Sequence, residues 1–320
     1  MEIIENDWSL IVDEHFKNIR DVYFSFDFYT LFAKHFSGKP QGIFWEDENI
    51  VIFWPHLIRT KSEVNLEMDF NYEFFDLTTP YGYGGPLIKL YNEDQKKVKK
   101  SISDFLIKYR NHCKKNNFKT EFIRFHPFAK SWQTLNQFTD LNIKYGNEVV
   151  IVDLEPEIDT IFSNLSKSRR KNVRRGYKEE YEINIENKPS EDQIQNFLEL
   201  YYDTMGRRNA DKRYYFTKEF VNDHFKITKS VLIEAIIKGN VIGALICLEG
   251  EDYVHTQLTG FEYEYRNFFP SPIVHWEAIK YAKENNKKYF HFGGGNEQIL
   301  NFKMGFSKNT LPFYYGILEF

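Results

Sequence analysis

The chain contains 320 residues with a formal net charge of -4, and 18% of its residues are aromatic. Its length predicts two domains of about 150 residues each, and its small net charge gives no overall field that would favour nucleic acid or a membrane. The two cysteines, Cys113 and Cys247, match no metal-ligand spacing and are too few for a disulfide framework, so we expect a reducing, cytoplasmic location. With no leader-like start and no apolar run of about 18 residues, we expect neither export nor a transmembrane segment.

Strand and helix patterns alternate along the first half of the chain. Strands are predicted at 49–58 (NIVIFWPHLI) and at 76–88 (DLTTPYGYGGPLI), the second ending in a glycine turn. A lysine-rich amphipathic helix is predicted at about 93–116, and another strand at 120–127 (TEFIRFHP).

The second half repeats this order. Residues 231–260 alternate as three strands across the turns KGN and EGED, followed by a helix at about 271–286 and a strand at 289–292. Because meander, helix and strand occur twice, we predict two related α/β domains in tandem. A proline follows a strand-like segment in DLEPEID, which places the domains at 1–152 and 153–320.

The most basic segment is SKSRRKNVRRGYK, residues 166–178. On a helical wheel, one arc of roughly 140° collects most of its cations, and apolar residues lie opposite. The arc contains Lys167, Arg170, Lys171, Arg174, Arg175 and Lys178. A solvated surface helix is one interpretation. The other is a phosphate or pyrophosphate site, since like charges four residues apart destabilise a helix unless an anion neutralises them.

A glycine loop precedes an unusual lysine in YFHFGGGNEQILNFKMGF, residues 289–306. The glycines either cradle a phosphate at a helix start or allow close backbone approach, and they fit neither the Rossmann nor the P-loop pattern. Lys303 falls within roughly 60° of Ile299, Leu300 and Phe306 on the wheel, on the apolar face. It must therefore reach solvent, meet a carboxylate or face a cleft, where it could stabilise an oxyanion or act as a base.

The histidines give weaker signals. His255 alternates with Tyr253 and Gln257 on a predicted strand, which suggests one polar cleft wall. His126 and His291 lie near the ends of strands. No HExxH or other metal spacing and no GxSxG motif is present, so we expect no metal site and no zinc hydrolase or serine esterase.

Six segments, taken together and in order, resemble the FemABX-like proteins, whose tandem acetyltransferase-like (GNAT) domains each have a mixed, mostly antiparallel sheet flanked by helices. The resemblance covers about 76–320, with a looser match at 22–29. The segments are DLTTPYGYGGP (76–86), FIRFHP (122–127), SKSRRKNVRRGYK (166–178), YYDTMGRRNADKRYYF (201–216), VHTQLTG (254–260) and FHFGGGNEQILNFKMGF (290–306).

The resemblance implies transfer of an acyl or aminoacyl group from acyl-CoA or aminoacyl-tRNA to an amine of a cell-envelope precursor. That precursor, small or lipid-linked, would be a peptidoglycan stem peptide or an amino-sugar of a surface polysaccharide. No tightly bound cofactor and no DNA partner are expected, and tRNA is a partner if it carries the donor. In the bridge-forming relatives the lysine of a final FK pair stabilises the oxyanion, and that pair here is Phe302 and Lys303.

A transfer of this kind gives roles to further residues. Gly293, Gly294 and Gly295 would line the donor or acceptor, the basic face with Arg170, Arg174 and Arg175 would hold phosphates, and His255 is the candidate base. Assigned only to the cleft in general are Tyr83, Arg124, Thr204, Arg208, Asn209, Tyr215 and Gln257.

The chain lacks two features of related enzymes, which leaves an alternative function open. Acetyl-CoA enzymes of this fold carry a basic, glycine-rich pyrophosphate loop before the helix after their fourth strand, whereas EYRNFFPSP (264–272) has one arginine and no glycine. The long coiled-coil arm of some bridge-forming members is also missing. The alternative is a non-catalytic module of the same fold that binds tRNA or a nucleotide-linked sugar through its basic helix.

Overall fold

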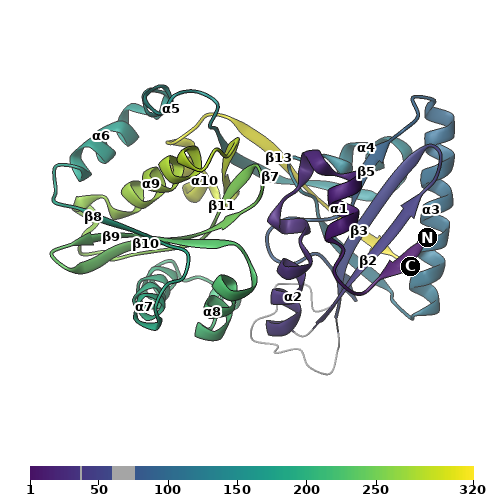
Figure 1. The fold of residues 1–320 in the computed structure, drawn as a ribbon, viewed down its shortest axis with the longest axis horizontal. Helices are drawn as coiled ribbons and strands as arrows, with labels where there is room; N and C mark the ends of the chain where they lie inside the picture. The colour runs from purple at the N-terminus through teal and green to yellow at the C-terminus, as the bar shows by residue number, and fades with distance from the viewer. Residues whose placement is uncertain (37, 60–75) are drawn as a thin grey trace. The chain divides into compact units, whose positions relative to one another are not determined.

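The computed structural model describes residues 1–36, 38–59 and 76–320, which form two compact units (Figure 1). Unit 1 contains residues 1–147 and 312–320, and unit 2 contains residues 148–311. The chain passes between the units within β7 (Asn142–Asp153) and again within β13 (Thr310–Glu319). The division thus differs from the predicted domains at 1–152 and 153–320 at the C-terminus, where β13 pairs with β6 (Thr120–Arg124) of unit 1.

Unit 1 is a mostly antiparallel sheet with helices on both faces. Its strand order is β1-β2-β3-β4-β6-β13, with β5 paired to β3 and only β4 and β6 parallel. The other elements of unit 1 are β1 (Glu2–Ile4), α1 (Ser9–His15), η1 (Lys17–Ile19), η2 (Val22–Phe24), α2 (Phe26–His35), β2 (Gly38–Glu46), β3 (Ile50–Arg59), β4 (Leu77–Thr78), β5 (Leu87–Leu90), α3 (Gln95–Lys115) and α4 (Ser131–Phe138).

Alternation along β3 sends side chains to both layers of unit 1. Ile52 and Trp54 pack with the apolar stripe of α3, whereas Phe53 contacts Trp8 beside α1. The single strand predicted at 76–88 is wrong, because β4 stops at Thr78 and β5 begins only at Leu87. Prolines and left-handed glycines break the segment between them, and at Gly85 (φ 75°) an added Cβ would lie 2.8 Å from Ile123.

Unit 2 has the strand order β7-β12-β11-β10-β9-β8, with β11 and β12 parallel and the other pairs antiparallel. The predicted meander, helix and strand are confirmed here. The elements are α5 (Ile158–Asn164), α6 (Lys167–Gly176), β8 (Glu182–Glu186), α7 (Glu191–Arg207), η4 (Lys212–Tyr214), α8 (Lys218–Ile227), β9 (Ser230–Ile237), β10 (Asn240–Glu249), β11 (Tyr253–Phe261), η5 (Arg266–Phe268), α9 (Pro270–Glu284), β12 (Tyr289–Gly293) and α10 (Glu297–Met304).

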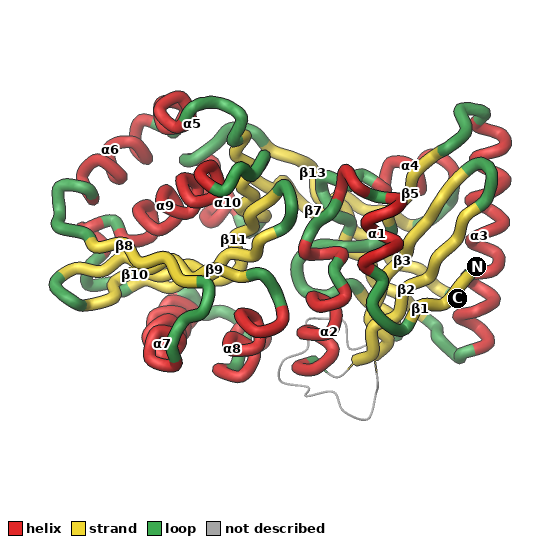
Figure 2. Tube along the Cα trace, in the orientation of Figure 1, coloured by secondary structure: helices red, strands yellow, loops and turns green. Residues whose placement is uncertain are grey.

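Two layers of helices cover the sheet of unit 2 (Figure 2). Helices α9 and α10 lie on one face and α7 and α8 on the other. Phe290 and Phe292 of β12 join the apolar core beneath α9, so His291 between them points to the α7 face. Gly260 allows α7 to approach β11, since an added Cβ would lie 2.5 Å from the Tyr201 amide nitrogen.

The described residues contain neither a membrane-spanning helix nor a cluster of metal-binding side chains. None of their helices is long and apolar enough to cross a membrane. No group of three or more of their histidine, cysteine, aspartate and glutamate side chains could hold a metal ion.

Candidate functional site

The glycine loop and the start of α10 are built by local backbone requirements. Gly293 (φ 68°) and Gly295 (φ 155°) occupy conformations that side chains disfavour, and a Cβ on Gly295 would lie 2.5 Å from Ile299. Asn296 caps α10, because its Oδ1 accepts a hydrogen bond of 3.0 Å from the Ile299 amide. The loop therefore turns the chain directly from β12 into α10.

Lys303 reaches back from α10 to this loop. Its Nζ donates a hydrogen bond of 2.5 Å to the Gly294 carbonyl oxygen. Part of the side chain stays exposed, yet protein surrounds the ammonium group, and burial, followed by the positive charge of Arg208, lowers the Lys303 pKa to about 7. The Lys303 ammonium is thus hydrogen-bonded to a carbonyl oxygen rather than enclosed by apolar groups alone. Two of its three protons remain for another acceptor.

Further cations surround Lys303. Arg208, at the end of α7, is close enough to lower its pKa, and Arg169 of α6 contacts the rings of α10. Burial lowers the pKa of His275 to about 3, with Arg169, Lys303 and Arg208 acting in the same direction, so this histidine is neutral. Within the described ranges, no carboxylate lies at ion-pair distance from Lys303, Arg208 or Arg169. The arrangement favours an anion.

Arg169 was missed by sequence reasoning, which placed the cations of its helix on the opposite arc. A signal was present, because Leu165, Arg169 and Val173 are spaced by four residues and all three are buried. The guanidinium donates a hydrogen bond of 2.8 Å from Nη2 to the Phe302 carbonyl oxygen. The same helical argument that singled out Lys303 therefore applies to Arg169.

His255 lies on the opposite face of the unit 2 sheet from α10. It is fully buried, and its Nδ1 lies 3.0 Å from Nδ1 of His291, which points to the α7 face of the sheet, whereas Lys303 belongs to α10 on the α9 face. The structure therefore places the predicted base and the predicted oxyanion donor on opposite faces of the sheet, and a role for His255 stays a prediction.

A β-bulge changes the predicted alternation along β11. Leu258 pairs with Ile246 and Thr256 with Cys247, which leaves Gln257 as the extra residue. Simple alternation therefore does not carry from His255 to Gln257. The Gln257 Nε2 atom is buried and has no hydrogen-bond partner among the described residues.

The other predicted residues of the α7 segment have structural contacts. The Thr204 hydroxyl accepts a hydrogen bond of 3.0 Å from the Phe261 amide and ties α7 to β11. Asn209 follows Arg208 in the left-handed region (φ 46°), and the Tyr215 ring lies 5.8 Å from that of Tyr202. Of this group, only Arg208 acts electrostatically on Lys303.

The basic face of α6 is largely exposed, with Arg170 half-buried. Arg174 and Arg175 lie over the rings of Phe162 and Phe269, at 5.3 and 5.0 Å, while Arg170 donates to the Ser163 and Leu165 carbonyls. None of the cations on this face has a carboxylate at ion-pair distance in the part of the chain that the structure describes.

The start of α9 cannot supply the usual backbone cradle for a pyrophosphate. Pro270 and Pro272 have no N–H, and the Ile273 amide already donates to the Phe269 carbonyl at 3.1 Å. Only the Ser271 amide remains in the first turn. Whether this helix start suits CoA poorly, as EYRNFFPSP suggests, stays a prediction.

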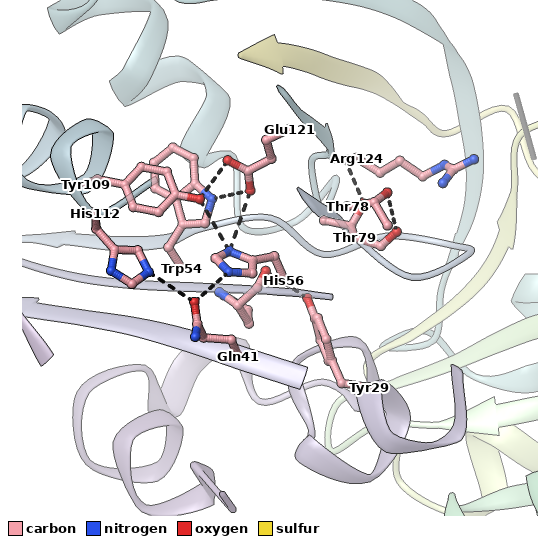
Figure 3. Close-up of polar contacts among 11 residues, drawn as sticks. Tyr29, Gln41, Trp54, His56, Thr78, Thr79, Tyr109, His112, Glu121 and Arg124 are labelled. Carbon is pink, nitrogen blue, oxygen red and sulfur yellow. Dashed lines mark hydrogen bonds and ion pairs between the residues drawn. The ribbon is translucent and has the colours of Figure 1, made fainter. Parts of the chain in front are cut away.

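Two predicted residues belong to unit 1. Tyr83 packs edge to face between Tyr23 and Phe313, with ring centroids 5.5 and 5.4 Å away. Arg124 lies 5.3 Å from the Phe122 ring, and Figure 3 shows its guanidinium extending away from a buried polar network.

That network centres on Glu121 of β6 (Figure 3). The carboxyl accepts a hydrogen bond from Trp54 Nε1 at 2.9 Å and lies 2.8 Å from the Tyr109 hydroxyl. That hydroxyl is also 3.3 Å from Nδ1 of His56, and His56 Nε2 lies 3.2 Å from the side-chain Oε1 of Gln41. Complete burial raises the Glu121 pKa to about 7, although both hydrogen bonds lower it, and burial lowers the His56 pKa to about 3.

Comparisons with known proteins place this geometry in a family. The model of the acetyltransferase (GNAT) domain matches residues 166–304. The chain is similar in structure to FemX, with a TM-score of 0.67, 11% identity and coverage of 98% of this chain and 97% of that one. No curated protein matches the chain significantly by sequence.

Two further solved structures share the architecture. One is the DUF2156 C-terminal domain assigned to a lysylphosphatidylglycerol synthetase of Agrobacterium fabrum, with a TM-score of 0.55, 11% identity and coverage of 90% and 86%. The other is a tandem GNAT protein from the clavulanic acid biosynthesis pathway, with a TM-score of 0.50, 8% identity and coverage of 91% and 87%. Residues 166–304 therefore match the acetyltransferase (GNAT) domain model, and the whole chain has a FemX-like fold, as its FemABX-like motifs predict.

Proposed function

We propose that the chain transfers an acyl or aminoacyl group from acyl-CoA or aminoacyl-tRNA to an amine of a cell-envelope precursor, either a peptidoglycan stem peptide or an amino-sugar of a surface polysaccharide. The observation that carries the proposal is Lys303, a partly exposed lysine on the helix after the glycine loop, whose ammonium group has cations and no described carboxylate around it. The FemX-like fold and the similarity to a domain assigned to lysylphosphatidylglycerol synthetase support an envelope acceptor.

The chemistry needs an oxyanion donor more than a nucleophilic side chain. The acceptor amine attacks the ester or thioester carbonyl carbon, and the carbonyl oxygen gains negative charge as the tetrahedral intermediate forms. Lys303 donates to that oxygen with a proton that Gly294 does not use, and Arg208 adds a positive field. Collapse breaks the carbon–oxygen or carbon–sulfur bond, releases tRNA or CoA, and leaves the amide after the amine loses its proton.

The pH dependence of transfer distinguishes the two roles open to Lys303. Its pKa of about 7 means that the ammonium form predominates below pH 7. If the ammonium stabilises the oxyanion, kcat/KM falls as the pH rises through about 7. If the neutral amine acts as a base instead, kcat/KM rises over the same range. We expect the falling limb, and we expect it to be missing from the Lys303→Arg profile, because arginine stays protonated. A rising limb that depends on Lys303 would contradict the oxyanion role.

Donor binding is testable without knowing the acceptor. A thermal-shift titration with uncharged tRNA and with acetyl-CoA separates the donors, since ligand at about 100 times its Kd adds roughly 2.7 kcal/mol of stability. Because the basic face of α6 is exposed and the start of α9 lacks amides, we expect the larger shift with tRNA, weakened by added salt. Arg174→Ala with Arg175→Ala should reduce it, whereas Lys226→Ala with Lys229→Ala, an equal loss of exposed charge, should not. A shift with acetyl-CoA alone would assign a thioester donor instead.

The basic face of α6, which has no described carboxylate at ion-pair distance, also favours the second candidate, a non-catalytic module that binds tRNA or a nucleotide-linked sugar. It predicts the same salt-sensitive tRNA shift and no product with any donor. Under this candidate, Lys303→Ala leaves every measured property unchanged.

A further inference from the structure

Helix α10 is too short to hold its own shape. It has eight residues, and isolated helices shorter than about 12 residues are marginal in water. Contacts at its two ends must therefore fix the position of Lys303. Asn296 caps the first turn, and α6 holds the last.

Arg169 makes the contact at the last turn. Its Nη2 donates to the Phe302 carbonyl oxygen at 2.8 Å, and its guanidinium carbon lies 4.1 Å from the Phe302 ring centroid and 4.5 Å from that of Phe306. The carbonyl belongs to the negative end of the helix, where a cation is favourable. Three residues before Arg169, the Ser166 amide donates a hydrogen bond of 2.9 Å to the Gly305 carbonyl oxygen.

The site is shaped for this guanidinium. A Cβ on Gly305 would lie 3.0 Å from Arg169 Nε, so glycine leaves room for the planar group. Arg169 is only 8% exposed, and among the described residues no carboxylate pairs with it and its Nε has no hydrogen-bond partner. A buried cation without an anion costs stability, and an apolar side chain would fill the space without that cost.

We propose that Arg169 is a positioning residue that holds α10, and with it the Lys303 ammonium, against the glycine loop. The proposal rests on the proposed role of Lys303 for its purpose and does not require that role for its test. Only a planar, multiply donating cation can stack on two rings and reach a helix carbonyl at once. Arg169 acts through geometry, whereas Arg208 acts on Lys303 by charge.

Hydrogen–deuterium exchange of the peptide covering α10 tests the contact. Arg169→Met should speed exchange of the α10 amides by about tenfold or more, because it removes a hydrogen bond to a charged donor. Gly305→Ala should do the same by displacing the guanidinium, and its helical φ of -65° tolerates alanine. Arg169→Lys should recover part of the protection. Arg266→Met is the matched control, since Arg266 also stacks on a ring, at 4.4 Å, and donates to a carbonyl, at 3.2 Å, but lies exposed away from α10.

The pKa of Lys303, measured by NMR on 13Cε-lysine protein, gives a readout that a purely structural role would not move. The charged or titratable groups around it are Arg208, Arg169 and His275. If α10 loosens, Lys303 gains solvent and its pKa rises toward 10.5 in Arg169→Met and Gly305→Ala, but not in Arg266→Met. Unchanged α10 exchange, an unchanged pKa, or faster exchange spread evenly over unit 2 would overturn the proposal. Because neither readout needs a substrate, this failure is separate from failure of acyl transfer.

Discussion

Lys303→Ala is expected to lower kcat/KM for acyl transfer by about 10²–10³-fold, the usual effect of removing one oxyanion donor, about 2.7–4 kcal/mol. The expectation follows from the free protons of the ammonium and from its place on α10 beside the glycine loop. The fold should persist, because the substitution removes a desolvated cation whose pKa is lowered to about 7. The measurement is steady-state kinetics with the donor identified by thermal shift, together with the melting temperature.

Two variants control for this result. Lys303→Met keeps the aliphatic stem and its packing, so it should lose as much activity as Lys303→Ala while melting no lower than the wild type. Lys308→Ala removes an exposed lysine shortly after α10 and should leave kcat/KM unchanged. Full activity in Lys303→Met, or unfolding in both Lys303 variants, would remove the basis for a catalytic role.

Glu121→Gln is expected to stabilise the protein against the wild type by an amount that grows by about 3 kcal/mol as the pH rises from 4.5 to 7. In the unfolded chain Glu121 loses its proton near pH 4.5, while burial keeps it protonated in the folded chain until about pH 7. The wild type therefore loses stability across this window as pH rises. Glutamine mimics the neutral acid and removes that loss.

The network in unit 1 explains why a neutral group fits there. With Glu121 protonated, its hydroxyl can donate to Tyr109, Tyr109 can donate to His56, and Trp54 Nε1 donates to the other carboxyl oxygen. An ionised Glu121 accepts the hydrogen bond from the Tyr109 hydroxyl, which then has no proton left to donate to His56 Nδ1. Every group in the chain of hydrogen bonds is satisfied only in the neutral form.

Urea unfolding of wild type and Glu121→Gln at several pH values measures this difference. Glu319→Gln is the control, because it makes the same chemical change at an exposed position on β13 in the same sheet. A stability difference that stays flat between pH 4.5 and 7 would show that Glu121 is ionised in the folded chain.

The parts of the site that could be predicted from the sequence are those that depend on residues close together in the chain. A helical wheel and a run of glycines suffice to single out Lys303 and its loop, and the spacing of strands and turns gives the meander of unit 2. The family-like motifs added Arg208, which acts on Lys303.

The missing parts depend on contacts distant in sequence. Arg169 meets Phe302 across 133 residues, and no periodicity reports that pairing. The bulge at Gln257 breaks the alternation that placed it beside His255, because one extra residue in a strand leaves no mark in the sequence. Glu121 lies between Thr120 and Phe122 on a short strand, and only the layer of α3 above it shows that the carboxyl is sealed from solvent.

The most direct test of the account is the pKa of Lys303 in the unmodified protein. It is obtained from an NMR titration of 13Cε-lysine protein, with Lys303→Arg identifying the resonance. The account predicts a midpoint of about 7, because burial and Arg208 disfavour the ammonium. A midpoint near the ordinary 10.5 would mean that Lys303 is an exposed surface lysine, and the oxyanion role, with the acyl transfer built on it, would lose its support.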